Sequence, residues 1–168
     1  MGTLISAPEK LTAAHSTEGF DSGAPALDDW FRRHALASQR ADTTRTFVVC
    51  VGKRVAGFYS LAVGAVDCIS VAPRIAQGVG RHPLPVMVLA RLAVDHRNSG
   101  QGIGRGLLKD AILRTVQASE FAGIRALLVH AKDDGVRSFY EKCGFEPSPL
   151  DPLQLLLLMK DARKTLGL

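Results

Sequence analysis

Apolar side chains near the N-terminus follow a helical spacing. The stripe at i, i+3, i+4 and i+7 is formed by Leu27, Trp30, Phe31 and His34. This spacing predicts an amphipathic helix that ends near residues 39–41. Asp28 and Asp29 lie in its first turn, where a negative charge is favoured by the positive end of the helix dipole.

Strand-like segments come next. Residues 45–51 and 55–66 are rich in β-branched and apolar side chains, and the turn-like residues 52–54 join them. They predict a long antiparallel hairpin. After an irregular stretch at 69–83, residues 86–94 form a continuous apolar run, which predicts a strand that is buried on both faces.

The C-terminal half alternates helices with strands. We expect a helix at 102–119, a strand at 124–131, a further helix that Asp133 caps and Gly144 ends, and a last strand at 153–160. The whole order is helix, hairpin, then strand–helix–strand–helix–strand. It predicts a mixed α/β sheet with helices packed on it, and 168 residues suit a single domain over 1–168.

The composition of the chain limits which kinds of partner it can bind and where in the cell we expect it. The chain carries a net charge of +5 and has a pI near 9.4. This favours an anionic partner such as nucleic acid, a phosphorylated cofactor or an acidic protein, with a merely solvated basic surface as the alternative. No apolar run approaches the roughly 18 residues that span a bilayer, and the N-terminus has no signal core, so we expect a cytoplasmic protein without membrane contact.

Cysteine and histidine spacings predict no metal site. Cys50, Cys68 and Cys143 cannot all pair, and their spacing matches no zinc knuckle. We interpret each as a small buried hydrophobic residue. The five histidines show no metal-binding spacing such as H-E-x-x-H.

The most informative segment is a glycine-rich stretch between a predicted strand and a predicted helix. Its sequence is Ser99-Gly100-Gln101-Gly102-Ile103-Gly104-Arg105-Gly106. The first amides of a helix have no partner and attract anions, so a pyrophosphate is the expected ligand, with Arg105 adding a charge. Neither the P-loop spacing nor the dinucleotide spacing fits. The alternative is a turn that binds nothing, although four glycines at a helix start weaken it by roughly 1 kcal/mol each.

Two sequence blocks occur together in the C-terminal half. The first is Leu92-Ala93-Val94-Asp95 followed by Gly100-Gln101-Gly102-Ile103-Gly104, and the second is Ser138-Phe139-Tyr140-Glu141-Lys142-Cys143-Gly144-Phe145. Both blocks resemble the GNAT N-acyltransferase superfamily. The resemblance implies the α/β GNAT fold, a single mixed, mostly antiparallel sheet with a central parallel strand pair and helices on both faces. It also implies acetyl-CoA as co-substrate, held by Leu92, Ala93, Val94, Ser99, Gly100, Gln101, Gly102, Ile103, Gly104, Arg105, Asp133, Ser138 and Phe139.

Two positions depart from the family pattern. Ser99 stands where the family usually has Arg or Gln, and Asp133 stands where an Asn often precedes the last helix. The backbone donors are unaffected by either change. A side-chain contact to coenzyme A is either lost or made by a neighbouring residue.

The family places a catalytic tyrosine at Tyr140, where its hydroxyl would stabilise the leaving thiolate as charge develops. The alternative is that Tyr140 is a core aromatic. The resemblance also implies a strand bulge near Arg91 to Val94 whose amides polarise the thioester carbonyl. No side chain stands out as a general base: Glu141 and His130 are candidates by sequence proximity only.

The missing base agrees with a particular acceptor. An α-amine titrates near 7.7–8.0, lower still when its carboxyl is esterified, whereas a lysine amine titrates near 10.4. An esterified α-amine is therefore largely neutral near pH 7 to 8 and needs only water to take its proton.

The N-terminal half resembles one GNAT branch, the acetyltransferase toxins of bacterial toxin–antitoxin pairs. The matching blocks are Phe20-Asp21-Ser22-Gly23, Leu27-Asp28-Asp29-Trp30, Arg32-Arg33-His34-Ala35, Arg45-Thr46-Phe47-Val48-Val49 and Gly57-Phe58-Tyr59-Ser60-Leu61. The branch implies acetylation of the α-amine of aminoacyl-tRNA, a ribbon–helix–helix antitoxin, a homodimer, and DNA contact only through the antitoxin.

Arginines supply the candidate tRNA contacts, because tRNA is a polyanion. The candidates are Arg32, Arg33, Arg40, Arg45 and Arg91. Arg91 lies within a predicted buried strand, where an unpaired charge is costly, and is the strongest candidate. Two other functions remain open: a GNAT enzyme for protein or small-molecule amines, and a non-catalytic module that binds coenzyme A.

Overall fold

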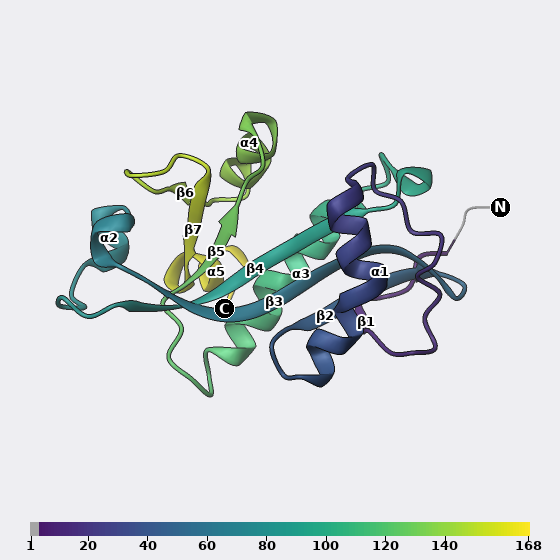
Figure 1. The fold of residues 1–168 in the computed structure, drawn as a ribbon. Helices are drawn as coiled ribbons and strands as arrows, with labels where there is room; N and C mark the ends of the chain where they lie inside the picture. The colour runs from purple at the N-terminus through teal and green to yellow at the C-terminus, as the bar shows by residue number, and fades with distance from the viewer. Residues whose placement is uncertain (1–3) are drawn as a thin grey trace. The chain divides into compact units, whose positions relative to one another are not determined.

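The computed structural model describes residues 4–168, which form two compact units. Unit one contains the chain up to Ala62 together with Ala90–Ala111, and unit two contains Val63–Leu89 together with Ile112–Leu168. Two strands and one helix run through both: β3 (Arg54–Val66), β4 (Leu84–Val94) and α3 (Ile103–Ala118). Within the described residues, seven strands form one mixed sheet in the order β1-β2-β3-β4-β5-β7-β6 (Figure 1).

Unit one builds its part of the sheet from antiparallel neighbours. β1 (Glu9–Lys10) pairs with β2 (Arg45–Val51), and β2 pairs with β3 from Arg45↔Leu61 to Val51↔Arg54, with a bulge between Val49 and Cys50. Helix α1 (Pro25–Arg40) precedes this hairpin. The predicted hairpin and the first predicted helix are therefore confirmed.

Helices cover both faces of the sheet in unit one. Phe31 of α1 stacks on Phe58 of β3 with ring centroids 4.0 Å apart. The next strand residue, Tyr59, points to the opposite face, where its hydroxyl donates to Asp110 of α3 at 2.5 Å. Gly57 lies on this second face, and a Cβ there would come within 3.0 Å of Ile103 and Leu107. Glycine at this position thus lets α3 approach the strand closely.

Unit two contains the parallel strand pair. β4 pairs with β5 (Ala126–His130) in parallel from Val86↔Ala126 to Leu89↔Val129, and β5 pairs antiparallel with β7 (Gln154–Leu158). β6 (Glu146–Pro147) pairs with the outer side of β7. The other elements of this unit are η1 (Cys68–Ser70), α2 (Pro73–Ala76), α4 (Asp134–Lys142) and α5 (Met159–Thr165).

In the core of unit two, side chains from β4, β5 and β7 pack against α2. Ile75 of α2 is fully buried against Leu84, Ala126 and Leu156. Gly144, at the end of α4, lies on the other face, where its Cβ position is 3.6 Å from Leu157. Its φ of +96° confirms the expected stop of that helix at a glycine.

Several local predictions are wrong. His34 is exposed, and Ala35 takes the buried position beside Phe31 instead. β4 contains four buried residues and seven that are partly accessible or exposed, so it is not buried on both faces. The last strand ends at Leu158, and Met159–Thr165 forms a helix because its apolar residues Met159 and Ala162 are spaced three apart and face the core.

The cysteines also differ from expectation. No disulfide joins Cys50, Cys68 and Cys143, and of these three only Cys50 is buried, whereas Cys68 and Cys143 are partly accessible. Within residues 4–168, no helix has the length and apolar character required to cross a membrane.

Candidate functional site

The glycine-rich segment links β4 to α3 in unit one. After β4, the short helix η2 (His96–Asn98) leads into the loop, where Gly100 and Gly102 have φ values of +75° and +76°. These left-handed conformations favour glycine. The amide of Gly106 donates to the carbonyl of Gly102 at 3.1 Å, which marks the first hydrogen bond of the helix. The amides of residues 103–105 therefore have no carbonyl one turn earlier to bind.

The side chains around these amides suit an anion. Arg105 is exposed, as are Gly102 and Gly106, and it forms no ion pair within residues 4–168. The Ser99 hydroxyl donates to the carbonyl of His96 at 3.0 Å, so it braces the loop. Ile103 is buried and anchors the start of α3. Free amides at the positive end of a 16-residue helix, with one cation beside them, favour the binding of an anion.

Asp95 fastens the base of this loop. Its carboxylate has 0% exposure and accepts hydrogen bonds from the Asp21 amide at 3.1 Å and from the Arg97 amide at 2.9 Å. The Arg97 guanidinium donates to both carboxylate oxygens, at 2.9 and 2.8 Å. These hydrogen bonds from Arg97 hold the pKa of Asp95 well below its usual range, against the opposing effect of burial. Asp95, whose role the sequence leaves open, is therefore structural.

We expect Asp95→Asn to lower the free energy of unfolding by about 1.5–3 kcal/mol, because it removes the charge from a set of buried hydrogen bonds. The depressed pKa also makes the wild type lose stability as pH falls below about 4, the pKa of an unfolded aspartate. The variant should lose less over the same range. Urea denaturation at pH 3 and pH 7 measures both effects, and equal acid sensitivity in the two proteins would contradict this role.

The end of β4 that leads into the loop extends beyond its pairing with β5. The parallel register of β4 with β5 ends at Leu89↔Val129, whereas β4 continues to Val94. Leu92 and Val94 are partly accessible, while Ala93 packs in the core with α1. Backbone amides for the thioester carbonyl at Leu92, Ala93 and Val94 remain a prediction.

Tyr140 lies in unit two, on the buried side of α4. Its ring is 6% exposed and makes edge contacts with Phe139 and Phe145, at centroid distances of 5.2 and 5.4 Å. Within residues 4–168 its hydroxyl forms no hydrogen bond, yet it is not sealed from solvent. Burial, helped by the nearby Cys143, raises the pKa of Tyr140 to about 12. The phenol is therefore protonated at neutral pH and can act as a hydrogen-bond donor but not as a base.

The other predicted residues of this half lie at the surface of α4 or at its start. Asp133 caps the helix by accepting from the Val136 amide at 2.9 Å, as expected. Ser138 and Phe139 lie on the accessible part of the helix. Glu141 pairs with Arg137 at 3.5 Å and His130 is exposed at the end of β5, so neither is shown to be a base. The loop belongs to unit one and Tyr140 to unit two, so each is positioned by the contacts of its own unit.

The five candidate arginines differ in how their guanidinium groups are used. Arg32 donates to the Phe20 carbonyl at 2.5 Å, and Arg45 donates to the Gln39 carbonyl at 3.1 Å and to Asp42 at 2.8 Å. Arg33 reaches only Asp29, at 3.8 Å, and Arg40 is exposed without an ion pair in the described chain. Arg91 stacks on Trp30 with its guanidinium carbon 3.6 Å from the ring centroid. The apolar spacing that placed Trp30 on a helix did not predict its contact with Arg91.

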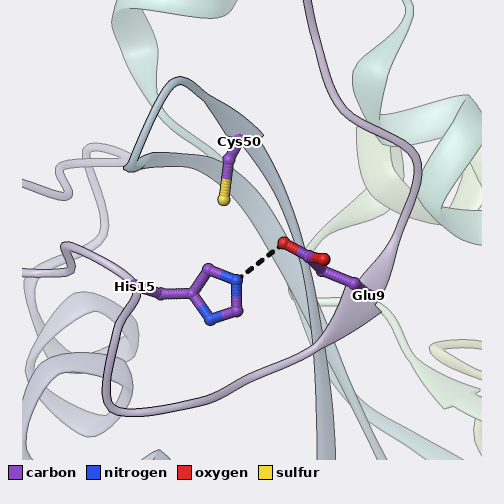
Figure 2. A group of neighbouring side chains, drawn as sticks. All are labelled: Glu9, His15 and Cys50. Carbon is purple, nitrogen blue, oxygen red and sulfur yellow. Dashed lines mark hydrogen bonds and ion pairs between the residues drawn. The ribbon is translucent and has the colours of Figure 1, made fainter.

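One trio of possible metal ligands comes together near β1. Donor atoms of Glu9, His15 and Cys50 lie within 4.8 Å of one another (Figure 2). The His15 ring accepts the Thr12 amide proton at Nδ1, at 2.9 Å, so its own proton is on Nε2, which faces Glu9 Oε1 at 2.8 Å. A metal on Nε2 would force this proton to Nδ1, against the Thr12 donor. Burial and the charge of Glu9 also raise the pKa of the Cys50 thiol, which disfavours the thiolate a metal needs. The trio is best described as a hydrogen-bonded pair, Glu9 and His15, beside a buried cysteine.

Comparisons with known proteins agree on one family. The family described as "Acetyltransferase (GNAT) domain" matches residues 42–147. A tRNA-acetylating toxin of Mycobacterium tuberculosis is 48% identical over 162 residues, which cover 96% of this chain and 97% of the toxin.

Solved structures of toxins share the fold over nearly the whole chain. AtaT complexed with acetyl-methionyl-tRNAfMet has a TM-score of 0.89 and 25% identity, covering 96% of this chain and 99% of AtaT. A Tyr-to-Phe mutant of AtaT bound to the C-terminus of the antitoxin AtaR and acetyl-CoA has a TM-score of 0.83 and 25% identity, covering 98% and 99% of the two chains.

Proposed function

Because the chain belongs to the GNAT acetyltransferase family, we propose that it is a toxin that transfers acetyl from acetyl-CoA to the α-amine of aminoacyl-tRNA. An acetylated α-amine cannot attack the ester of peptidyl-tRNA to form a peptide bond, so translation stops. The similarity to a tRNA-acetylating toxin at 48% identity, over 96% of this chain, carries the proposal.

Acetyl-CoA is the co-substrate in this proposal. The amides of residues 103–105 and the side chain of Arg105 receive its pyrophosphate, and the accessible part of β4 at Leu92–Val94 receives its thioester. Support comes from the helix-start geometry and from acetyl-CoA in the structure of the AtaT mutant. Backbone amides and one guanidinium supply the positive potential that a pyrophosphate needs, so binding it requires no metal.

The reaction needs one proton to leave and one to arrive. The neutral α-amine attacks the thioester carbonyl carbon, the C–S bond breaks, and water takes the proton from the amine nitrogen. Tyr140 donates a hydrogen bond to the sulfur as the thiolate forms, and the departing thiolate takes a proton from solvent to give the thiol of coenzyme A. A phenol with a pKa near 12 keeps its proton in the resting enzyme and stabilises charge that exists only in the transition state.

The expected partners follow from the same family branch. The acceptor is aminoacyl-tRNA in the cytoplasm, and a ribbon–helix–helix antitoxin neutralises the toxin. The AtaT structure with the C-terminus of AtaR supports an antitoxin partner. We further propose a homodimer that contacts DNA only through the antitoxin.

We expect kcat/KM to rise with pH to a plateau near pH 8 and to stay level up to pH 10. The rise follows deprotonation of the esterified α-amine, whose pKa lies below about 7.7–8.0. The neutral phenol is the active form, and burial raises the pKa of Tyr140 to about 12, so its loss comes only above that plateau. Initial rates with freshly charged aminoacyl-tRNA, corrected for hydrolysis of the ester at each pH, measure the profile. A decline centred near pH 9 would assign the hydrogen bond to the sulfur to another group.

The decisive experiment offers the purified protein acetyl-CoA and charged total tRNA. Mass spectrometry of the terminal adenosine adducts should show one acetyl group on the aminoacyl moiety. Parallel reactions with peptides and polyamines test the alternative, a GNAT enzyme for protein or small-molecule amines. Turnover on those amines with none on aminoacyl-tRNA would overturn the proposal, and coenzyme A release with no acetylated acceptor would favour a non-catalytic module.

A further inference from the structure

Arg91 carries a charge that the protein itself does not neutralise. Its side chain is partly buried on β4, and within residues 4–168 it forms neither a hydrogen bond nor an ion pair. Burial lowers the pKa of its guanidinium, although an arginine stays protonated in proteins. A charge held away from water without a counter-ion is unfavourable unless a ligand supplies one.

Other arginines of the chain show how a structural guanidinium is satisfied. Arg97 donates to both oxygens of Asp95, and Arg74 pairs with Glu146 and Asp161. Arg125, which is partly buried like Arg91, donates to the carbonyls of Ile75 and Gln77, at 2.7 and 3.1 Å. The donors of Arg91 have no such acceptor in the described chain, which sets it apart from the arginines that hold the fold together.

The aromatic contact fixes the guanidinium before any ligand binds. Arg91 lies 3.6 Å from the centroid of the Trp30 ring, and Trp30 in turn stacks on Phe58, with centroids 6.4 Å apart and planes at 25°. Phe58 is fully buried in the core of unit one. A guanidinium stacked on an aromatic ring keeps its edge N–H groups, which match two oxygens of a phosphate or carboxylate. The pair is therefore preorganised to bind an anion.

The position along β4 indicates which anion. Arg91 comes directly before Leu92–Val94, the segment proposed to hold the thioester, whereas the pyrophosphate loop begins after the other end of that segment. At about 3.3 Å per residue, three residues separate Arg91 from the loop side of the strand by about 10 Å. Because the pyrophosphate of acetyl-CoA is proposed to lie at the loop end of this segment, an anion bound at the Arg91 end lies on the acceptor side of the thioester. In aminoacyl-tRNA, the phosphate nearest the reacting amine is the 5′-phosphate of the terminal adenosine, since the amino acid is esterified to that ribose.

We propose that Arg91, stacked on Trp30, is a preorganised receptor for a backbone phosphate at the single-stranded 3′ end of the tRNA acceptor. The inference rests on the proposed function and adds the phosphate and the Trp30 platform to it. It differs from a general basic surface, because one fixed guanidinium binds one phosphate.

The test measures binding of deacylated total tRNA by fluorescence anisotropy between 50 and 200 mM salt. Arg91→Met should weaken binding about 10-fold and reduce the slope of log K against log [salt] by about 0.7–0.9, the value for one phosphate contact. Arg91→Lys keeps the charge but loses the two-pronged geometry, so it should retain the slope and bind with intermediate affinity. Trp30→Leu should behave like Arg91→Lys, because the charge remains but is no longer held.

Lys160→Met is the matched control, since it removes one exposed positive charge from α5, outside the proposed binding residues. It should bind tRNA like the wild type. We expect Arg91→Lys to keep the melting temperature and the KM for acetyl-CoA of the wild type. This result would show that its weaker binding of tRNA does not come from a damaged fold.

Distinct outcomes separate the two proposals. If the wild type acetylates aminoacyl-tRNA but Arg91→Met binds tRNA with unchanged affinity and slope, the receptor is wrong and the proposed function stands. A loss confined to acetyl-CoA affinity would assign Arg91 to the cofactor, and a loss confined to binding of the antitoxin would assign it to a protein carboxylate. Both results overturn the receptor. If the wild type acetylates no aminoacyl-tRNA, the proposed function itself fails.

Discussion

Tyr140→Phe lowers kcat for acetyl transfer by an expected 100- to 1000-fold, which is the range of about 10²–10³ for losing one hydrogen-bond donor to a developing negative charge. The variant removes one oxygen and keeps the buried ring against Phe139 and Phe145. Since the hydroxyl has no hydrogen bond within residues 4–168, its loss leaves no buried donor or acceptor unpaired. The melting temperature and the KM for acetyl-CoA should therefore change little. Release of the coenzyme A thiol, followed with a chromogenic disulfide, measures kcat, and expression in bacteria should no longer arrest growth.

Tyr59→Phe is the matched control, because it should lower stability and keep kcat, whereas Tyr140→Phe should lower kcat and keep stability. Tyr59 is also a buried tyrosine, but its hydroxyl donates to Asp110 at 2.5 Å. Its removal should lower the free energy of unfolding by about 1.5–3 kcal/mol, as for a hydrogen bond to a charged group, and leave kcat within a few-fold of the wild type. A Tyr140→Phe protein that keeps full kcat and still arrests growth would show that Tyr140 is only a core aromatic.

Gly102→Val should raise the KM for acetyl-CoA by about 10- to 100-fold, the equivalent of losing one hydrogen bond to a charged group. Gly102 has a φ of +76°, which a β-branched residue tolerates poorly. The chain would relieve the strain by rotating the backbone just before the free amides of residues 103–105. Isothermal titration with coenzyme A measures the effect without the chemical step.

Gly52→Val separates strain from binding. Gly52 has a φ of +63° in the turn between β2 and β3, and a Cβ there, as at Gly102, meets no atom within 4 Å. Both variants should lose about 1–2 kcal/mol of stability from the left-handed conformation. Only Gly102→Val should lose affinity for coenzyme A. Equal affinities in the two variants would mean that the loop amides do not hold the pyrophosphate.

The features that could be predicted from the amino-acid sequence are local. The β2–β3 hairpin, the glycine loop before α3, the Asp133 cap and the Gly144 stop each depend on side-chain spacing or on φ within a few neighbouring residues. Such short-range preferences act before the chain is packed, so a pattern in the sequence is enough to predict them. The loop and Tyr140 could be proposed as candidate site features for the same reason, since each lies in a short motif.

Which distant residues meet, and which strand faces are covered, depends on how the elements pack in three dimensions. The carboxylate of Asp95 binds the amide of Asp21 across 74 residues of sequence, and Arg91 meets Trp30 because α1 packs on the sheet beside β4. The accessible positions of β4 likewise follow from its neighbours, although its sequence is mostly apolar along that run. These contacts depend on the order of strands in the sheet and on the helices that cover it, and no spacing within a single segment contains that information.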